Sequence, residues 1–255
     1  MQRDSVAARD ASLALSDPGE LVLPDNAAHI WMLNEDLVGH ACSALAHTLS
    51  PDERQRARDY RKQTRRDAYI ARRGMLRSLM ARYLACRPES LRFGVTGFGR
   101  PVLQWPHGAR LAFNVSHTGG IALFAFAWDC RVGVDVERQV DGIYVEGIGR
   151  GILSSVEEAA LGAARADSAS TFFRIWTRKE ALLKALGTGL SGEPDAYTTE
   201  EHPSLCNGGW RASCNGNALS GWTCLDLNLG PGMQGAIAVS LENARVTFYR
   251  CASPI

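Results

Sequence analysis

The sequence predicts a mixed α and β fold, and three stretches carry that prediction. Between Asp67 and Leu84 the apolar side chains fall within one arc at about 100° per residue, the period of an amphipathic helix. Ile121 to Trp128 is an unbroken apolar run of strand length, and Leu111 to Val115 before it has strand character as well. Helical and strand patterns thus occur in one chain.

The N-terminal part begins with a segment that has no clear periodicity. Residues 1–27 are rich in Ala, Ser and Asp with two prolines, which predicts a poorly ordered leader. His29 to Leu33 (HIWML) is a short strand candidate. A helix is expected to open after Ser50, because Ser followed by Pro51 at the first helical position is an N-terminal capping signal.

The centre of the chain reads as a loop followed by strands. Gly94 to Gly99 with Arg100-Pro101 is expected to be a loop. The two apolar strands are expected to enclose a Ser-His-Thr-Gly-Gly turn at 116–120, and Val132 to Glu137 (VGVDVE) forms the next strand.

Two helices and further strands complete the pattern. Helical periodicity covers Ser155 to Ala166 and Thr171 to Leu186, and Gly187 and Gly189 stop the second helix. Strand-like segments then return at 223–229, 235–241 and 244–251. With 255 residues, the chain is long enough for one large or two modest domains.

Composition narrows the possible partners and location. The formal net charge is only +1, although residues 51–82 hold ten Arg and one Lys against four acids, so a local anionic ligand is expected. Seven scattered cysteines lack zinc spacing and indicate reduced thiols in the cytoplasm. The first ten residues lack a secretory signal, and no apolar run approaches the roughly 20 residues of a membrane span.

Two carboxylates share one face of a predicted strand. Asp135 and Glu137 alternate with Val134 and Val136, so the acids point one way and the valines point into the core. Adjacent carboxylates repel unless a hard cation such as Mg²⁺ lies between them, and Gly133 leaves room for a close approach. The alternative is a solvated strand edge with two ordinary acids.

The helix around Trp176 adds charged groups beside an apolar face. Lys179 lies on the same face as Trp176, and Glu180 and Lys184 form an i,i+4 pair on its flank. The pair is either a surface ion pair contributing about 0.3–0.5 kcal/mol or a metal ligand next to a phosphate contact. Arg72 and Arg73 raise a similar question, because they fall in the apolar arc of their helix and either snorkel or face a cleft.

Ser116 and His117 do not form a serine hydrolase site. Adjacent residues of an extended chain point to opposite sides, and the GxSxG pattern is absent. A histidine near a glycine turn can instead donate to a phosphate, with Ser116 helping, or it is a hydrogen-bonded structural residue.

The order of three motifs is similar to that of the 4′-phosphopantetheinyl transferase superfamily. Asn-Val-Ser-His-Thr at 114–118 is followed by Gly-Val-Asp-Val-Glu at 133–137 and by Trp-x-x-Lys-Glu-Ala-x-x-Lys at 176–184. The likeness reaches back through Gly99-Arg100-Pro101 and the Arg73-to-Arg77 helix to His29, and thins after about Leu190. It implies the longer single-chain type: an α+β fold of two similar α/β subdomains in a pseudo-twofold arrangement, 28–129 and 130–255, with the active site between them.

By motif match, the resemblance implies three sets of site residues. The Mg²⁺ ligands are Asp135, Glu137 and Glu180. The contacts to coenzyme A are Arg73, Arg100, Ser116, His117, Lys179 and Lys184. The catalytic side chains are Glu180, Lys184 and Asp135. Glu157 in Leu-Ser-Ser-Val-Glu resembles an acid of a weaker motif that supports the site. Arg100 stands where the family usually has Lys, which preserves the charge but changes the phosphate geometry.

The activity implied is transfer of 4′-phosphopantetheine from coenzyme A to a serine of an apo acyl or peptidyl carrier protein, with Mg²⁺ as cofactor and 3′,5′-ADP released. The resemblance further implies a cytoplasmic monomer that binds neither nucleic acid nor membrane. Two rival classes remain distinguishable by experiment. A magnesium-dependent phosphate-ester hydrolase would turn over coenzyme A without a carrier, and a nucleic-acid-binding module would use the Arg-rich helix and bind with steep salt dependence.

Overall fold

The computed structural model describes residues 8–11, 21–35, 42–97, 99–140, 149–202 and 208–251. The helices among them are α1 (Cys42–Thr48), α2 (Pro51–Asp59), α3 (Gln63–Tyr83), α5 (Ser155–Ala163) and α6 (Ser168–Leu186). The strands are β1 (Ala8–Ala11), β2 (Ala27–Asn34), β3 (Arg92–Val95), β4 (Pro101–Trp105), β5 (Leu111–Thr118), β6 (Ile121–Trp128), β7 (Val132–Arg138), β8 (Tyr197–Glu201), β9 (Trp210–Cys214), β10 (Asn217–Ala218), β11 (Thr223–Asp226), β12 (Met233–Val239) and β13 (Arg245–Cys251). The mixed α and β class predicted from the sequence is confirmed.

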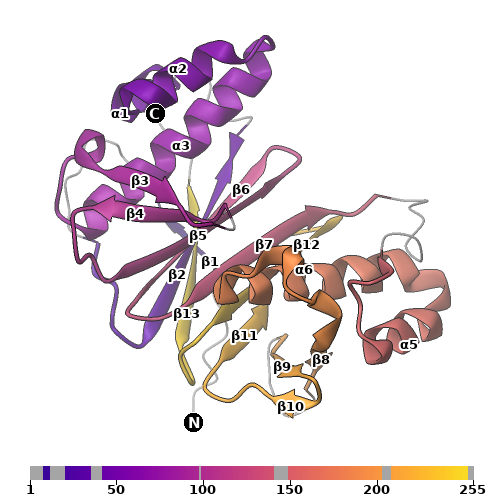
Figure 1. Cartoon of the computed structure of the whole chain (residues 1–255). Helices are drawn as coiled ribbons and strands as arrows, with labels where there is room; N and C mark the ends of the chain where they lie inside the picture. Colours follow the sequence, from indigo (N-terminus) through magenta and orange to yellow (C-terminus); the bar gives the residue numbers. More distant parts are fainter. Residues whose placement is uncertain are drawn as a thin grey trace.

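Two sheets form the centre of the molecule (Figure 1). The larger has the order β1-β13-β2-β6-β5, and the smaller has the order β11-β12-β7. In the larger sheet β13 pairs in parallel with both β1 and β2, whereas β2, β6 and β5 pair antiparallel. Strands from both ends of the chain therefore complete one sheet. A third sheet, β10-β9-β8, and the hairpin β3-β4 lie outside these two.

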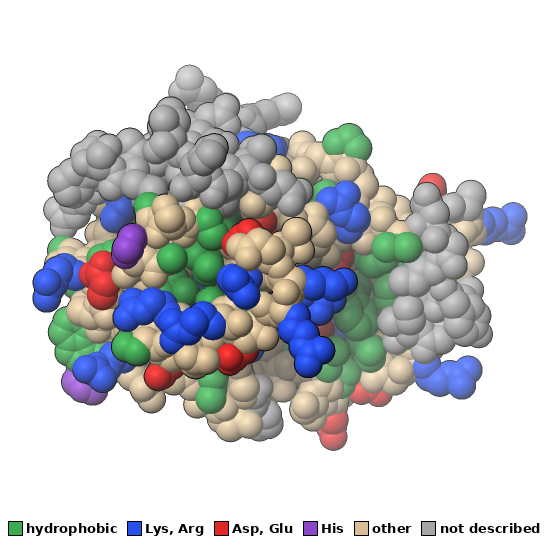
Figure 2. Space-filling model, turned by 90° about the horizontal axis from the view of Figure 1, so that it is seen from above, with side chains coloured by type: hydrophobic (Ala, Val, Ile, Leu, Met, Phe, Trp, Pro, Cys, Tyr) green, Lys and Arg blue, Asp and Glu red, His purple; other side chains and the backbone are tan. Residues whose placement is uncertain are grey.

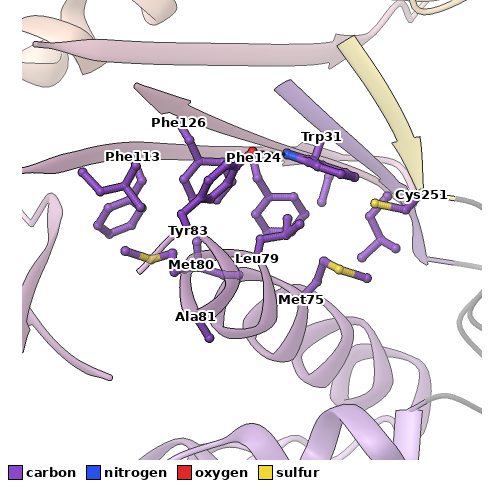
Figure 3. Packing of buried hydrophobic residues seen from close by; sticks show 14 of the residues in the cluster. Trp31, Met75, Leu79, Met80, Ala81, Tyr83, Phe113, Phe124, Phe126 and Cys251 are labelled. Atoms are coloured by element: carbon purple, nitrogen blue, oxygen red, sulfur yellow. Dashed lines mark hydrogen bonds between the residues drawn. The ribbon is translucent and has the colours of Figure 1, made fainter. Parts of the chain in front are cut away.

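The layers follow the order helix, sheet, sheet, helix. One core packs α3 on the larger sheet, with Leu79 and Tyr83 of the helix against Phe124 and Phe126 of β6 (Figure 3). A second core fills the space between the sheets and includes Val134 of β7. A third core packs α6 on the far face of the smaller sheet and on β9. Each sheet thus has one long helix on its outer face, and the two inner faces pack against each other.

Helix α2 begins where the capping signal predicts it. The hydroxyl of Ser50 accepts a hydrogen bond from the Glu53 backbone N–H, and the Glu53 carboxylate accepts one from the Ser50 N–H. This reciprocal pair satisfies two backbone donors at the start of α2. The predicted helix 67–84 is observed as α3, and Gly187 ends α6 in the left-handed conformation with φ 85°.

Two sequence predictions of local structure are wrong, and one sheet was missed. Residues 92–105 form the hairpin β3-β4 around a shorter loop than the predicted one. Ser116, His117 and Thr118 belong to β5, and the turn consists of Gly119 and Gly120, which both have positive φ. The sheet β8-β9-β10 was missed: β8 is mostly polar and β10 has only two residues, although β9 alternates apolar and polar side chains with a period of two.

Within the predicted leader, the structure describes residues 8–11 and 21–27. Residues 8–11 form β1 on the edge of the larger sheet, since the outer edge of β13 offers free backbone groups for pairing. Leu23 and Ala27 are buried. The rest of the predicted leader, residues 1–7 and 12–20, lies outside the described residues.

A membrane span is not found in the part of the chain that the structure describes: its helices do not combine the necessary length with sufficient apolar character.

Candidate active site

Strand β7 places the two predicted acids toward helix α6. Val132, Val134 and Val136 enter the core between the sheets, so Asp135 and Glu137 point to the opposite face, as the period of two predicts. Gly133 allows the close contact there: a Cβ on it would lie 2.0 Å from the Ala181 carbonyl oxygen of α6. The glycine therefore brings the helix, rather than a cation, next to the strand.

Helix α6 brings an ammonium group onto the first of these acids. Lys184 Nζ lies 2.5 Å from Asp135 Oδ1 and donates to it. Lys184 is partly exposed, whereas Asp135 is 2% exposed. The pair joins the strand and the helix that the sequence motifs had marked separately, and it leaves the Lys184 side chain partly exposed.

Strand β5 adds Ser116 to this pair. The Ser116 hydroxyl donates to Asp135 Oδ1 at 2.7 Å and accepts from Lys184 Nζ at 3.1 Å. The second carboxylate oxygen, Asp135 Oδ2, is buried and has no hydrogen-bond partner. An unpaired buried carboxylate oxygen is costly and is an orphaned ligand position.

The negative charges of Asp135, Glu137 and Glu180 affect one another's pKa values. Burial raises the pKa of the Glu180 carboxyl, Lys184 opposes that shift, and Asp135 and Glu137 raise it further. Burial also raises the pKa of Glu137, and Asp135 adds to the effect. Three acids from β7 and α6 therefore converge closely enough to repel, and a cation would relieve that repulsion.

The three acids are not preassembled as a metal site. Among the residues described by the structure, no group of three His, Cys, Asp or Glu side chains has the spacing to hold a metal ion. The Lys184 ammonium is the positive charge next to Asp135. The chemistry of the donors still fits a hard divalent cation, because all are carboxylate oxygens and one is unpaired.

His117 points to the other side of β5, toward α3. Its neighbours Phe113 and Val115 on alternate positions pack with the α3 core. Burial lowers the pKa of His117, and Arg72 lowers it further, while Glu35 opposes the shift. Arg72 Nη1 donates to both carboxylate oxygens of Glu35 at 2.8 and 2.9 Å. The structure therefore does not bring Ser116 and His117 together on one ligand face.

Lys179 is not placed at the site, in contrast to the prediction of a diphosphate contact. Its amine lies 2.7 Å from Glu157 Oε2 and donates to the carbonyl oxygens of Pro194 and Tyr197 at 2.8 and 2.5 Å. All three N–H groups are thus used, and Lys179 is 1% exposed. Five residues separate it from Lys184, which is about 140° around the helix, so the two lysines face different sides.

Glu157 is a structural anchor in the same buried pair. It caps α5 through the Ser154 N–H at 2.8 Å and accepts from the backbone N–H and hydroxyl of Thr199, both at 2.9 Å. It supports the site only from a distance, by fixing α5 and β8 against α6.

The two arginines predicted to hold the nucleotide are in separate places. Arg73 forms an ion pair with Glu53 and lies over the Phe93 ring, 4.2 Å from its centroid. Arg100 donates to the Ala185 carbonyl at 3.3 Å near the end of α6, and burial and Arg131 lower its pKa. Arg100 also lines a cavity of about 360 Å³ between the β3-β4 hairpin, β5 and the end of α6.

One face of the molecule carries several basic side chains. Figure 2 shows Lys and Arg side chains close together in the middle of the face seen from above Figure 1. Such a face attracts anions. A cavity of about 720 Å³ lies elsewhere, between the first turn of α5 and strands β8 to β10, and none of the predicted site residues lines it.

Sequence reasoning missed several residues around the acids. Hydrogen bonds from Thr118 and Trp176 favour the charged form of Glu137. Asn114 Oδ1 accepts from the Val134 N–H at 3.1 Å. The signal was present in β5, where the polar residues Asn114, Ser116 and Thr118 alternate with larger side chains and so share one face.

Clustered carboxylates, a partly exposed lysine and basic side chains on one face of a mixed α and β scaffold are features that suit a phosphate-bearing anion. Comparisons with known proteins identify the enzyme class. Residues 131–227 match the model of the 4′-phosphopantetheinyl transferase superfamily, and residues 38–128 match that of the N-terminal region of 4′-phosphopantetheinyl transferases.

Individual relatives agree with the family models. The chain is 33% identical over 183 residues to 4′-phosphopantetheinyl transferase HetI of Nostoc sp., covering 69% of this chain and 76% of HetI. It is 29% identical over 158 residues to 4′-phosphopantetheinyl transferase Sfp of Bacillus subtilis, covering 60% and 67% of the two chains. The L-aminoadipate-semialdehyde dehydrogenase-phosphopantetheinyl transferase of Schizosaccharomyces pombe is 35% identical over 161 residues, covering 57% and 62%. The chain therefore belongs to the 4′-phosphopantetheinyl transferase superfamily and is an enzyme of that class.

Proposed function

We propose that this enzyme transfers the 4′-phosphopantetheine group of coenzyme A to a serine of an apo acyl or peptidyl carrier protein, depends on Mg²⁺ and releases 3′,5′-ADP. The observation that carries the proposal is the pair Asp135–Lys184, in which one carboxylate oxygen is held at 2.5 Å and the other is buried without a partner. An ion-binding carboxylate and an adjacent ammonium group suit a diphosphate substrate.

The chemistry is displacement at phosphorus. The hydroxyl oxygen of the acceptor serine forms a bond to the β-phosphorus of coenzyme A, and the bond from that phosphorus to the oxygen bridging to the α-phosphate breaks. The serine proton passes to a base, and 3′,5′-ADP leaves with the bridging oxygen. Such a transfer needs alignment and charge neutralisation more than covalent help from the protein.

Glu180 is proposed as the base, directly or through a water. Its pKa is raised by burial and by the neighbouring acids, which makes the carboxylate a better proton acceptor than an exposed glutamate. Lys184 is proposed to stabilise the charge on the leaving oxygen, because it carries a positive charge on a partly exposed side chain.

Asp135, Glu137 and Glu180 are proposed to hold Mg²⁺, which would neutralise diphosphate oxygens and complete its coordination from them. The described acids alone do not form a ligand set. Two features favour a cation among them: Asp135 Oδ2 has no hydrogen-bond partner, and the charges of Glu137 and Glu180 repel each other.

For the nucleotide end, we propose His117 and Arg100 as contacts. His117 lies beside Arg72, so a phosphate would meet two donors in one area if Arg72 left Glu35. The cavity at Arg100 would admit the base or ribose. Arg73 would have to leave Glu53 to take part.

We also propose that the two halves of the chain, near 28–129 and 130–255, are related by a pseudo-twofold axis. The helix, sheet, sheet, helix order supports this arrangement, although β13 crosses into the first sheet. A cytoplasmic monomer is proposed as well. The six described cysteines are free, which is typical of a reducing compartment.

The decisive test is mass spectrometry of a purified apo carrier protein incubated with the enzyme, coenzyme A and Mg²⁺. We expect one phosphopantetheine per acceptor serine and loss of the reaction when Mg²⁺ is chelated. Asp135→Asn should lower the rate at least about 100-fold with a native circular dichroism spectrum. The exposed carboxylate of Glu200 offers a control, since Glu200→Gln should leave the rate unchanged. Turnover of coenzyme A without a carrier would instead identify a hydrolase.

A further inference from the structure

Strands β5 and β7 meet at the boundary between the two sheets without backbone pairing. β5 is the last strand of the larger sheet, and β7 is the last of the smaller. Two side chains of β5 take the place of strand carbonyls: Asn114 Oδ1 accepts from the Val134 N–H at 3.1 Å, and Ser116 Oγ accepts from the Val136 N–H at 3.4 Å. The two donors, Val134 and Val136, flank Asp135 in β7. These two side-chain hydrogen bonds, called the seam below, therefore hold the strand segment that carries the acid.

The hydrogen bonds of Ser116 are all used within the protein. A serine hydroxyl has one donor and two acceptor positions. Its hydrogen goes to Asp135 Oδ1 at 2.7 Å, and its lone pairs accept from Lys184 Nζ at 3.1 Å and from the Val136 N–H. Ser116 is also buried. A phosphate oxygen accepts hydrogen bonds but cannot donate one unless protonated, and Ser116 has no hydrogen left for it.

Both neighbours of Asp135 bind the same oxygen. Ser116 and Lys184 donate to Oδ1, whereas Oδ2 is buried and unpaired. Two donors on one oxygen fix the carboxylate about its terminal bond, so the direction of Oδ2 is set by the protein before any ligand arrives. Groups that orient a ligand in this manner commonly change metal affinity by about 10–100-fold when they are removed.

We infer that Ser116 is a positioning residue rather than a coenzyme A contact: its hydroxyl clamps Asp135 Oδ1 together with Lys184 and presents Asp135 Oδ2 as the oxygen that binds the divalent cation. This inference rests on the proposed function, and it departs from the role that the sequence motif implies for Ser116. It also assigns different tasks to adjacent residues, since His117 faces the α3 side and remains free to meet a phosphate.

The test uses Mn²⁺ as the probe, because it favours the same carboxylate ligands as Mg²⁺ and its free form is counted by electron paramagnetic resonance. Binding is measured on the full chain with coenzyme A present. Ser116→Ala should weaken Mn²⁺ binding about 10-fold or more and should change the Michaelis constant for coenzyme A much less. Ser116→Thr keeps the hydroxyl and should restore most of the Mn²⁺ affinity.

Asn114→Ala is the matched control. It removes the neighbouring bond of the same seam, to the Val134 N–H, and has no recorded bond to Asp135. It should lower the melting temperature to a similar extent as Ser116→Ala without weakening Mn²⁺ binding. If both variants weaken Mn²⁺ binding equally, the effect is one of folding and the inference is overturned.

The remaining outcomes separate the inference from the proposed function. A Ser116→Ala protein with unchanged Mn²⁺ affinity and a raised Michaelis constant for coenzyme A would show that Ser116 is a substrate contact. Wild-type protein that binds no Mn²⁺ in the presence of coenzyme A would overturn both the inference and the metal dependence. If Ser116→Ala does not fold, Ser116→Thr decides alone, because full loss of Mn²⁺ binding in that variant contradicts a role carried by the hydroxyl.

Discussion

Lys179 and Lys184 lie on one helix, yet their surroundings differ completely. Lys179 donates to three acceptors inside the protein and is almost fully buried. Lys184 and Ser116 both donate to Asp135 Oδ1, and the Lys184 side chain is partly exposed. Burial lowers the pKa of Lys179, and Glu157 counteracts this by stabilising the ammonium form. The first lysine therefore supports the fold, and only the second is available for chemistry.

Lys179→Met tests that division. Removing one partner of a buried ion pair leaves the Glu157 charge without its cation, so the free energy of unfolding should fall by about 3–5 kcal/mol in urea titration. The Michaelis constant for coenzyme A should not change at temperatures where the variant is folded. Lys184→Met should show the reverse pattern, with a large loss of transfer and a smaller loss of stability. A stable Lys179→Met protein with poor coenzyme A binding would restore the role implied by the motif.

His29 should make the protein sensitive to mild acid. Its Nδ1 lies 2.9 Å from the Tyr83 hydroxyl, which also accepts from Trp31 Nε1 at 2.8 Å. Burial and the nearby Arg245 lower its pKa from 6.5 to about 4. Since the unfolded chain binds this proton more readily, the free energy of unfolding should fall as the pH drops from 6.5 toward 4, by up to about 3 kcal/mol.

Urea titrations across that pH range measure the effect. His29→Gln should flatten the curve below pH 6.5. An unchanged slope in His29→Gln would mean that another group governs acid unfolding.

The sequence predicts the acids of the site better than its cations. A period of two is enough to put Asp135 and Glu137 on one face, because a strand leaves no other choice. The partners of Lys179 and Arg73 come from Glu157 and Glu53, far away in the chain, and no local pattern contains that information. The partner of a long basic side chain therefore depends on which acceptors the completed fold brings near it.

At the scale of elements, the packing of α6 on β7 depends on a glycine, Gly133. The Cβ that an alanine would add at Gly133 would lie 2.0 Å from the Ala181 carbonyl oxygen and 2.5 Å from the Ala185 nitrogen. Both are backbone atoms of α6 and cannot move aside without moving the helix. The helix and its Glu180 and Lys184 therefore hold their place only because position 133 is glycine.

Gly133→Ala should lower the free energy of unfolding by roughly 1–3 kcal/mol or more through overpacking, and transfer should fall further than stability alone explains. Gly162→Ala in α5 is the control, since nothing lies within 4 Å of its added Cβ and alanine favours a helix by about 0.5–1 kcal/mol. Thermal unfolding and the mass-spectrometric transfer assay measure both effects. Native activity in Gly133→Ala would contradict the tight contact.

The elements that the sequence predicts correctly have strong local signals. α2 has its capping box, α3 its apolar arc, and β6 its apolar run. Strand β8 carries polar residues such as Thr198 and Glu200, and β10 has only two residues, so neither has a hydrophobic period; β9 does alternate apolar and polar side chains, but over only five residues. Their pairing is stabilised by α6 packing on Trp210 and Ala212, which is a tertiary effect.

At the scale of the whole molecule, the larger sheet joins the two ends of the described chain. β13 lies between β2 and β1, with parallel pairing on both sides. Without β1, the outer edge of β13 would present unpaired N–H and C=O groups, and such edges promote pairing with another chain.

A chain lacking residues 1–20 should therefore self-associate at roughly micromolar to millimolar concentration, as measured by analytical ultracentrifugation. A chain lacking only residues 1–7 retains β1 and should behave like the full-length protein. A monomeric, equally stable 1–20 deletion would show that β1 does not protect the edge.

The position of β13 beside β2 also bears on how the protein is made. Its residues 245–251 leave the ribosome after the other described strands, yet β2 needs them as its neighbour. During synthesis, the nascent N-terminal half exposes one open flank of β2 until β13 has been made. Chaperones that shield extended segments would be most useful during that interval, and premature stop codons shortly before position 245 would be expected to yield chains destined for degradation.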